Sequence, residues 1–227
     1  MTMCCIRFLL FGLLFTSHLL LAQENFTGYY QPQIAFNYEV SPFYSHNFSL
    51  ENRNYFIQEG RSRFQVRHLH LAHFSNLKIK DNQSIALGIQ YRFRETFDEG
   101  SNEIRLTQQY NITNRPFVVR YGHRLRAEQR ILKSLTIHRF RYRFSLDFPL
   151  QGERLDIGEA YLIGNVETLL SVAKLTNPEY DQRFTLNIGW LLNKELKFQI
   201  GAEYRFEDFT EGTQHVLFFL RTLNFSL

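Results

Sequence analysis

The clearest pattern along this chain is an alternation of polar and apolar residues in two neighbouring segments, 118–131 and 139–148. In the first segment, even positions hold mainly arginines and other polar or small residues, and odd positions are mainly apolar. After a break at Lys133 and Ser134, the alternation returns with arginines at odd positions and aromatic residues at even positions. Only a β-strand points successive side chains to opposite faces. The pattern therefore predicts two long adjacent strands with one arginine-rich face and one apolar face.

The same two-residue period recurs in nine further segments, and no segment of the mature chain predicts a helix. The predicted strands span residues 33–40, 48–56, 61–74, 84–94, 103–112, 118–131, 139–148, 159–172, 183–192, 196–207 and 215–227. Two of these segments change parity. In 61–74 we expect a β-bulge near His68 to restore the faces, because a bulge inserts one extra residue. In 215–227 the apolar residues shift from even to odd positions after Leu220.

These features favour a transmembrane β-barrel over a soluble secreted binding protein, although alternation alone is compatible with both. Several strands keep the alternation for about ten residues or more, the length that a tilted strand needs to cross a bilayer. Tyr and Phe gather at the ends of the apolar faces, and the chain ends within an apolar strand. We predict an all-β fold, an antiparallel up-and-down transmembrane β-barrel with a lumen rich in Arg and Glu. Because bacterial single-chain barrels have an even number of strands, we expect twelve strands, with ten as the alternative.

An energetic argument assigns the arginine face to the lumen. If an arginine faces lipid at the bilayer midplane, the cost is roughly 2–4 kcal/mol, so seven outward arginines would cost on the order of 10–30 kcal/mol. Native domains are stable by only roughly 5–15 kcal/mol. The arginines must therefore face inward if the barrel lies in a membrane.

The N-terminal segment and the cysteines predict export. Residues 1–22 contain the basic Arg7, a following apolar run and then Ala22, which is typical of a cleavable signal peptide. A retained transmembrane helix is the alternative, but the run is short for a span of about 20 residues. Both cysteines, Cys4 and Cys5, fall in this segment. The mature chain therefore has no disulfide, no cysteine nucleophile and no cysteine metal ligand.

Charge and composition narrow the classes of function. We expect residues 23–227 to form a single barrel domain that lies in the cell outer membrane as a monomer. The formal net charge of +4 is too small to predict a nucleic-acid partner. The mature chain holds 19 Arg and 6 Lys, and Arg suits confined sites in which a planar fork bonds several acceptors. The expected partners are the lipid bilayer, the barrel-assembly machinery during biogenesis and small anionic solutes. We expect no cofactor.

Five segments carry a resemblance to a known family: NEIRLTQQY, HRLRAEQR, HRFRYRF, QRFTLNIGW and IGAEYRF. They resemble a family of predicted outer-membrane β-barrels of Gram-negative bacteria that is catalogued only as a domain of unknown function. The resemblance covers nearly the whole mature chain, is most specific at 124–130 and 139–143, and departs from the family pattern mainly before Ser84. It implies an outer-membrane barrel and no established activity.

The arginine face supports two interpretations. The predicted lumen ladder consists of Arg120, Arg124, Arg126, Arg130, Arg139, Arg141 and Arg143. Its expected acidic partners are Glu103, Glu128, Glu159, Glu167 and Glu203, with Glu207 on the same face. If these acids pair with the arginines, they pack the interior, which is the interpretation that we favour here. If the arginines exceed their partners, the clustered guanidinium groups focus a positive field and form a narrow anion-selective path or an anion-binding site.

Other chemistry finds less support in the sequence. His68, His70 and His73 form an H-x-H-x-x-H pattern, but no third ligand accompanies the first two on their face, so we predict no metal site. A hydrolase that acts on lipid or lipopolysaccharide is the alternative from the enzyme class. It would need a Ser or Asp nucleophile beside a His base. His138 and Ser145 have opposite parity, and no G-x-S-x-G motif occurs. We therefore predict no catalytic residues.

Overall fold

The computed structural model describes residues 26–58, 60–94 and 102–227, and the predicted signal peptide at 1–22 lies outside the described residues. In these ranges, no helix has the length and apolar character needed to cross a membrane. The described chain forms eleven strands: β1 (Phe26–Ser41), β2 (Tyr44–Gln58), β3 (Arg61–Lys80), β4 (Gln83–Arg94), β5 (Glu103–Asn114), β6 (Arg120–Ile131), β7 (Thr136–Pro149), β8 (Ala160–Ala173), β9 (Glu179–Leu191), β10 (Leu196–Glu207) and β11 (Gln214–Ser226). Each predicted segment overlaps one of these strands.

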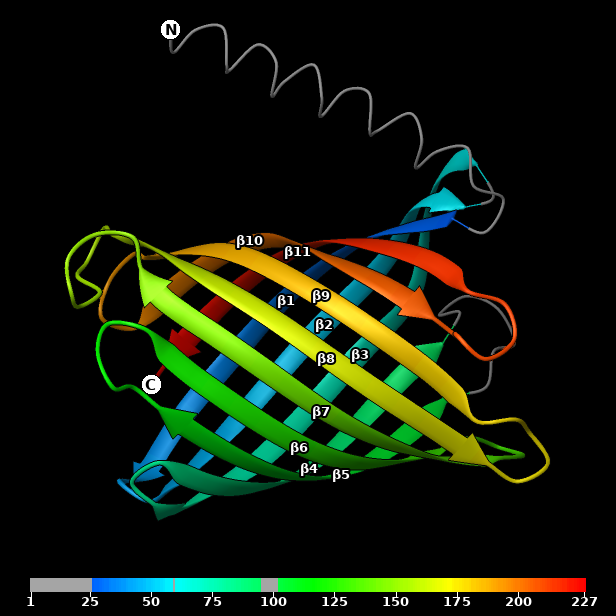
Figure 1. Ribbon diagram of the computed structural model, residues 1–227, viewed down its shortest axis with the longest axis horizontal. Coiled ribbons are helices and arrows are strands. Elements are labelled where there is room, and N and C mark those ends of the chain that lie inside the picture. Colours follow the sequence, from blue (N-terminus) through cyan, green and yellow to red (C-terminus); the bar gives the residue numbers. More distant parts are fainter. Residues whose placement is uncertain (1–25, 59, 95–101) are drawn as a thin grey trace, which may run out of the picture.

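The strands close into one barrel (Figure 1). Strands that are consecutive in the chain pair antiparallel, but the barrel closes where β1 lies parallel to β11, from Phe26 beside His215 to Asn37 beside Ser226. The predictions of twelve or ten strands, and of a wholly antiparallel barrel, are therefore wrong for the described residues. With an odd number of strands, the first and last run in the same direction, so the closing pair has to be parallel. The alternation by itself gives eleven segments, and the rule that bacterial barrels have an even number of strands does not hold for this barrel.

Parallel closure separates the two ends of the described chain. β1 begins at one end of the barrel, which we call the N-terminal mouth. β11 ends at the opposite end, the C-terminal mouth, which also carries the turns at 42–43, 81–82, 115–119, 150–159 and 192–195. There the backbone amide of Leu227 donates a hydrogen bond of 2.8 Å to the carbonyl oxygen of Asn37, so the closing pair stays bonded to its last residue.

The barrel wall separates apolar from ionic side chains. On the outer face, Leu87, Leu125 and Phe140 are 67%, 54% and 51% exposed. On the inner face, Glu103 and Glu128 are 0% and 1% exposed. This is the distribution expected for a barrel in lipid, since apolar groups belong in hydrocarbon and charges belong in a polar interior.

A few polar side chains on the outer face bond one another. The amides of Gln108 and Gln129 exchange hydrogen bonds of 3.2 and 3.3 Å, and the hydroxyl of Thr168 donates to the Gln182 amide oxygen at 2.8 Å. Mutual pairing reduces the cost of polar groups that face hydrocarbon.

The two changes of parity have different causes. In β3, His68 lies opposite Arg53 while Val66 lies opposite Asn54, which leaves Arg67 as the extra residue of a β-bulge. The bulge predicted near His68 is therefore confirmed. In contrast, β11 keeps its register throughout its pairing with β10. Its first apolar residues point inward instead, and Phe218 is fully buried.

An aromatic cluster thus lies inside the barrel beside the closing pair of strands. Phe218 stacks on Tyr29 of β1 with ring centroids 5.0 Å apart. The guanidinium groups of Arg205 and Arg53 lie 3.8 and 4.6 Å from the Phe218 centroid and cover its ring. Arginine over an aromatic face is a favourable contact, so a charged lumen accommodates this apolar cluster.

Candidate functional site in the barrel lumen

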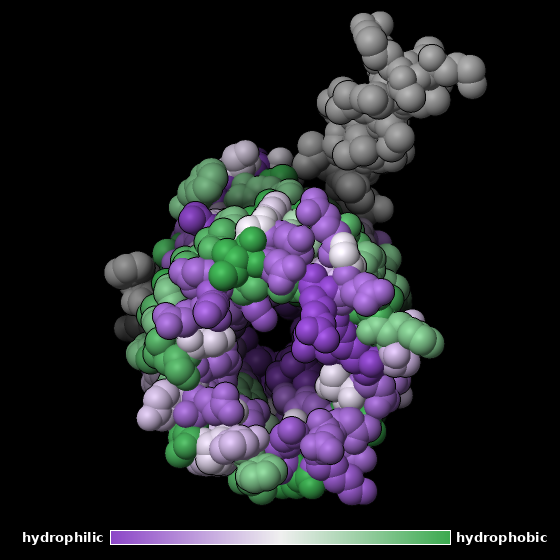
Figure 2. Space-filling view, turned by 90° about the vertical axis from the view of Figure 1, so that its left-hand side faces the viewer, coloured by the Kyte–Doolittle hydropathy of each residue, from purple (hydrophilic) through white to green (hydrophobic). Residues whose placement is uncertain are grey.

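The lumen holds a cavity of about 940 Å³ that is lined by side chains from all eleven strands. Figure 2 looks into the C-terminal mouth and shows a hollow surrounded mainly by hydrophilic residues, with hydrophobic residues toward the outside of the barrel. Among the described residues, thirteen arginines and eight carboxylates line this cavity. The wall of this cavity therefore carries more arginines than carboxylates.

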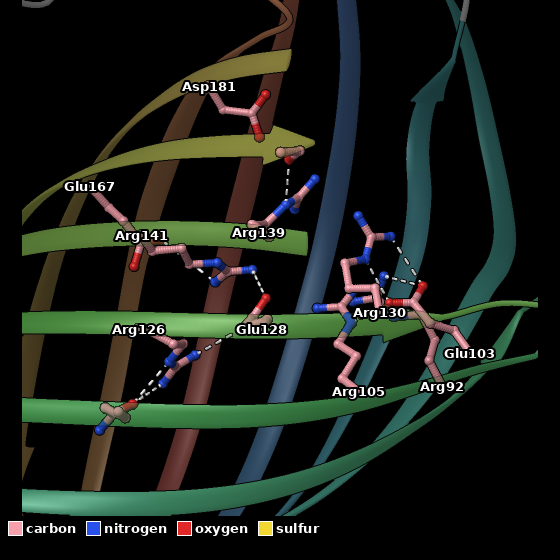
Figure 3. Close-up of polar contacts among 12 residues, drawn as sticks. Arg92, Glu103, Arg105, Arg126, Glu128, Arg130, Arg139, Arg141, Glu167 and Asp181 are labelled. Carbon is pink, nitrogen blue, oxygen red and sulfur yellow. Dashed lines mark hydrogen bonds and ion pairs between the residues drawn. The ribbon is translucent and has the colours of Figure 1, made fainter. Parts of the chain in front are cut away.

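Glu103, the first residue of β5, is the centre of one ionic cluster. Its carboxylate contacts four guanidinium groups, those of Arg92, Arg94, Arg105 and Arg130. The contact with Arg94 measures 2.6 Å and the contact with Arg130 measures 2.8 Å. Figure 3 shows Arg105 of the same strand and Arg130 of the neighbouring β6 directed at this carboxylate. One buried negative charge is thus shared by four positive charges.

Glu167 in the middle of β8 repeats the arrangement. Arg143 and Arg124 approach its carboxylate at 3.1 and 3.3 Å, and Arg141 and Arg183 approach at 3.8 Å. These four arginines come from β6, β7 and β9, so the carboxylate lies at the meeting point of three strands other than its own. Two of the four lie closer to other acids, Arg141 to Glu128 at 3.0 Å and Arg183 to Asp181 at 3.3 Å, so four arginines share three carboxylates.

Pairing between β6 and β7 brings like charges directly opposite each other. Arg124 lies across from Arg143, and Arg126 lies across from Arg141. Like charges at such positions destabilise a sheet unless something neutralises them. Glu128 provides part of the neutralising negative charge, because its carboxylate lies 3.0 Å from Arg141 and 3.5 Å from Arg126. The three side chains converge in Figure 3.

Phe74 and Gly88 form the part of the lumen wall beside Arg126. The Phe74 ring lies against Gly88, where an added Cβ atom would be 2.3 Å from the ring. The Arg126 guanidinium lies 5.3 Å from the centroid of the same ring. Its Nε and Nη2 atoms also donate to the Gln109 amide oxygen at 2.9 and 2.5 Å. A larger residue at position 88 would push Phe74 into the cavity.

The structure places six of the seven ladder arginines on the cavity wall, namely Arg124, Arg126, Arg130, Arg139, Arg141 and Arg143. The expectation for Arg120 is wrong. It is the first residue of β6, its side chain is 56% exposed at the C-terminal mouth, and it pairs with Asp147 at 2.8 Å. Alternation predicts the face on which a side chain lies but not its position along the barrel axis. It therefore does not distinguish Arg120, at the end of β6, from the ladder arginines deeper in the lumen.

Four of the five predicted acidic partners bond lumen arginines. They are Glu103, Glu128, Glu167 and Glu203, the last through a 2.5 Å contact with Arg205. Glu159 does not, and its assignment to the lumen is wrong. It precedes β8 in a turn, where its carboxylate accepts a hydrogen bond of 3.0 Å from the backbone amide of Asp156.

The three histidines separate across the wall. His68 and His70 lie in the lumen, where His70 approaches the Glu51 carboxylate at 3.6 Å. The ring of His73 lies on the opposite face, where it stacks on Phe48 at a centroid distance of 4.6 Å. In the described parts of the chain, no group of three or more potential ligands could hold a metal ion.

Several lumen residues were not singled out from the sequence. They are Glu51, Arg53, Arg92, Arg94, Arg105, Asp181, Arg183 and Arg205. Most occupy the polar parity of their strands, so the alternation did contain a signal. Arginines are dense along β6 and β7 and isolated on the other strands, although the isolated ones reach the same carboxylates.

Comparison with known proteins gives a family but no activity. No curated protein matches this chain. In-vitro folded OmpT, an outer membrane protein from Vibrio cholerae in its trimer form, is a similar solved structure, with a TM-score of 0.42 and 8% identity. The match covers 72% of this chain and 54% of that chain, so this chain spans about half the length of the solved structure that it matches. A family model described as a protein of unknown function (DUF2490) matches residues 30–216. The expected resemblance is therefore confirmed, and this chain belongs to the DUF2490 family of proteins of unknown function.

Proposed function

We propose that this protein spans the outer membrane of a Gram-negative cell and that its lumen admits small anionic solutes. The apolar outer face supports a position in lipid, because residues such as Leu87 and Phe140 are more than half exposed around a charged interior.

The excess of arginine over acid in an open cavity is the observation that carries the proposal. Glu103 contacts four guanidinium groups, and the four arginines at Glu167 share only two further acids, Glu128 and Asp181, so both clusters keep a net positive charge. Positive groups along a narrow lumen with apolar surroundings concentrate anions and exclude cations. Guanidinium groups also bind carboxylate and phosphate through two parallel hydrogen bonds.

A closed barrel whose ionic network serves stability alone is the second candidate. Its support is the burial of the two central acids, since Glu103 and Glu167 are 0% and 3% exposed and join neighbouring strands. The hydrolase alternative gains no support from the residues considered for it. Ser145 faces inward and donates to the Gly122 carbonyl oxygen at 3.4 Å, whereas His138 has the outward parity of β7.

Reversal potentials in a planar lipid bilayer test the proposal. The purified barrel is expected to pass chloride in preference to potassium. Replacement of Arg124, Arg126 and Arg141 together by Gln should lower this preference, because it removes three lumen charges. The matched control replaces Arg61, Arg63 and Arg154 by Gln, which removes the same charge from exposed positions outside the cavity.

The outcomes separate the candidates. Anion preference that falls in the lumen variant and persists in the control supports an anion path. A wild-type barrel that neither conducts nor binds anions, with a lumen variant that unfolds more easily, supports the purely structural network. An open channel that prefers cations contradicts both.

A further inference from the structure

The lumen changes character along its axis. The ionic residues extend to the N-terminal mouth, where Arg94 ends β4, Glu103 begins β5 and Glu207 ends β10. Toward the C-terminal mouth, the same cavity is lined by neutral amides. Any solute that occupies the whole cavity therefore meets two chemically different walls.

Six asparagines form the neutral part, which we call the amide vestibule. They lie on β1, β2, β3, β8, β9 and β11, in the part of each strand nearer the C-terminal mouth, and are Asn37, Asn47, Asn76, Asn165, Asn187 and Asn224. Gln199 of β10 also lines this region and donates to the Tyr161 hydroxyl at 2.7 Å. Their location on separate strands makes them converge only in the closed barrel.

Most of these amides are available to a ligand. Asn47 donates to the Asn37 amide oxygen at 2.8 Å. Within the described residues, the side chains of Asn76, Asn165, Asn187 and Asn224 make no hydrogen bond, although all four are half-buried and line the cavity. A primary amide has two donors and an acceptor with two lone pairs. Because these side chains are half-buried and directed into the cavity, their donors and acceptors can bond the hydroxyl groups of a ligand.

The vestibule joins the arginine clusters over a short distance. Asn165 and Glu167 project from the same face of β8, and two residues along a strand span roughly 6–7 Å. Glu167 carries Arg124 and Arg143 at 3.3 and 3.1 Å. A ligand that reaches from the amides to these guanidinium groups thus needs hydroxyl groups and an anionic group separated by about one sugar ring.

We infer that the preferred solute is a small saccharide that carries an anionic group, either a carboxylate or a phosphate. The amide vestibule hydrogen-bonds its hydroxyl groups in both directions, and the arginines around Glu167 bind its charge. The cavity of about 940 Å³ is large enough for such a molecule, since small-molecule sites occupy roughly 300–1,000 Å³. This inference rests on the proposed function, because it specifies which anions the lumen accepts.

The test compares four probes on the purified mature barrel in detergent: digalacturonate, glucose 6-phosphate, succinate and maltose. Titration calorimetry measures affinity even if the barrel does not conduct, and block of ion current measures it if the barrel does. The vestibule variant combines Asn165→Ala, Asn187→Ala and Asn224→Ala. Its matched control combines Gln108→Ala, Gln129→Ala and Gln182→Ala, which removes three amides from the outer face.

At least one anionic sugar should bind wild-type barrel about tenfold or more tightly than succinate or maltose, because several hydrogen bonds add to the ionic contact. The vestibule variant should lose most of this preference while its succinate affinity stays unchanged, and the outer-face control should behave as wild type. Binding of digalacturonate alone identifies a carboxylate ligand, and binding of glucose 6-phosphate alone identifies a phosphate ligand.

Two results would overturn the inference and leave the proposed function standing. One is equal affinity for succinate and both anionic sugars. The other is a vestibule variant that retains its sugar preference while the triple Arg→Gln variant loses anion binding. If no anion binds and no ion selectivity is found, the proposed function fails and this inference fails with it.

Discussion

Replacement of Glu103 by Gln is the sharpest test of the shared-carboxylate network. The substitution keeps the shape of the side chain and one oxygen acceptor, so it removes a charge without a cavity. Glu103 is fully buried and contacts Arg92, Arg94, Arg105 and Arg130. After the change, four guanidinium groups share a space that holds no central negative charge.

The expected loss of stability follows from these contacts. At an effective dielectric constant of about 20, each ionic contact near 3 Å is worth roughly 5 kcal/mol before desolvation is subtracted. Removal of one partner from a buried ionic group destabilises proteins by about 3–5 kcal/mol. We expect Glu103→Gln to lower the free energy of unfolding by about 3–5 kcal/mol, a large part of the roughly 5–15 kcal/mol typical of a domain.

Urea unfolding in lipid vesicles measures this loss, and the gel mobility of unheated protein reports the folded barrel. Glu153→Gln is the control, because Glu153 lies exposed in the 150–159 turn, and its change should stay within about 0.5 kcal/mol. Adding Arg94→Gln to Glu103→Gln should restore part of the stability, since one unpaired cation is removed. A Glu103→Gln barrel within about 1 kcal/mol of wild type would refute the reasoning, because the four arginines would then be neutralised by something other than Glu103.

Three further predictions concern the wall, the closure and the inner aromatic cluster. Val166→Arg should lower the free energy of unfolding in vesicles by about 2–4 kcal/mol, and Asn165→Arg should lower it clearly less, because only the charge at position 166 faces lipid. Equal losses in the same urea titration would invalidate the assignment of faces. Because β1 and β11 are parallel, Thr27 and Leu227 lie at opposite ends of the barrel. In vesicles that hold the barrel in one orientation, a cysteine at Thr27 and a cysteine at Leu227 should therefore react with a membrane-impermeant maleimide from opposite sides. Labelling of both from the same side would require an even number of strands. Phe218→Ala should lower the free energy of unfolding in urea by about 3–5 kcal/mol, because the ring is fully buried under Arg53 and Arg205. Phe219→Ala should cost less, because Phe219 points outward and lipid fills the space that its ring leaves. The reverse order would mean that the inner cluster is not packed.

Local alternation determined much of this protein from its sequence. The eleven strands, the inward arginines of β6 and β7 and the bulge beside His68 all follow from a period of two residues, because that period is a property of the strand itself. The cost of charge in lipid then decides which face is outward. The family resemblance followed from the same segments.

Only the closed barrel decided how these faces combine. The parallel pairing of β1 and β11, the sharing of Glu167 by arginines of β6, β7 and β9, and the amide vestibule depend on the register between strands. Alternation predicts a face but not a height along the barrel, which is why Arg120 and Glu159 were wrongly grouped with the lumen residues. Register is set by pairing across the whole sheet and by closure, so it places side chains from distant segments around one cavity.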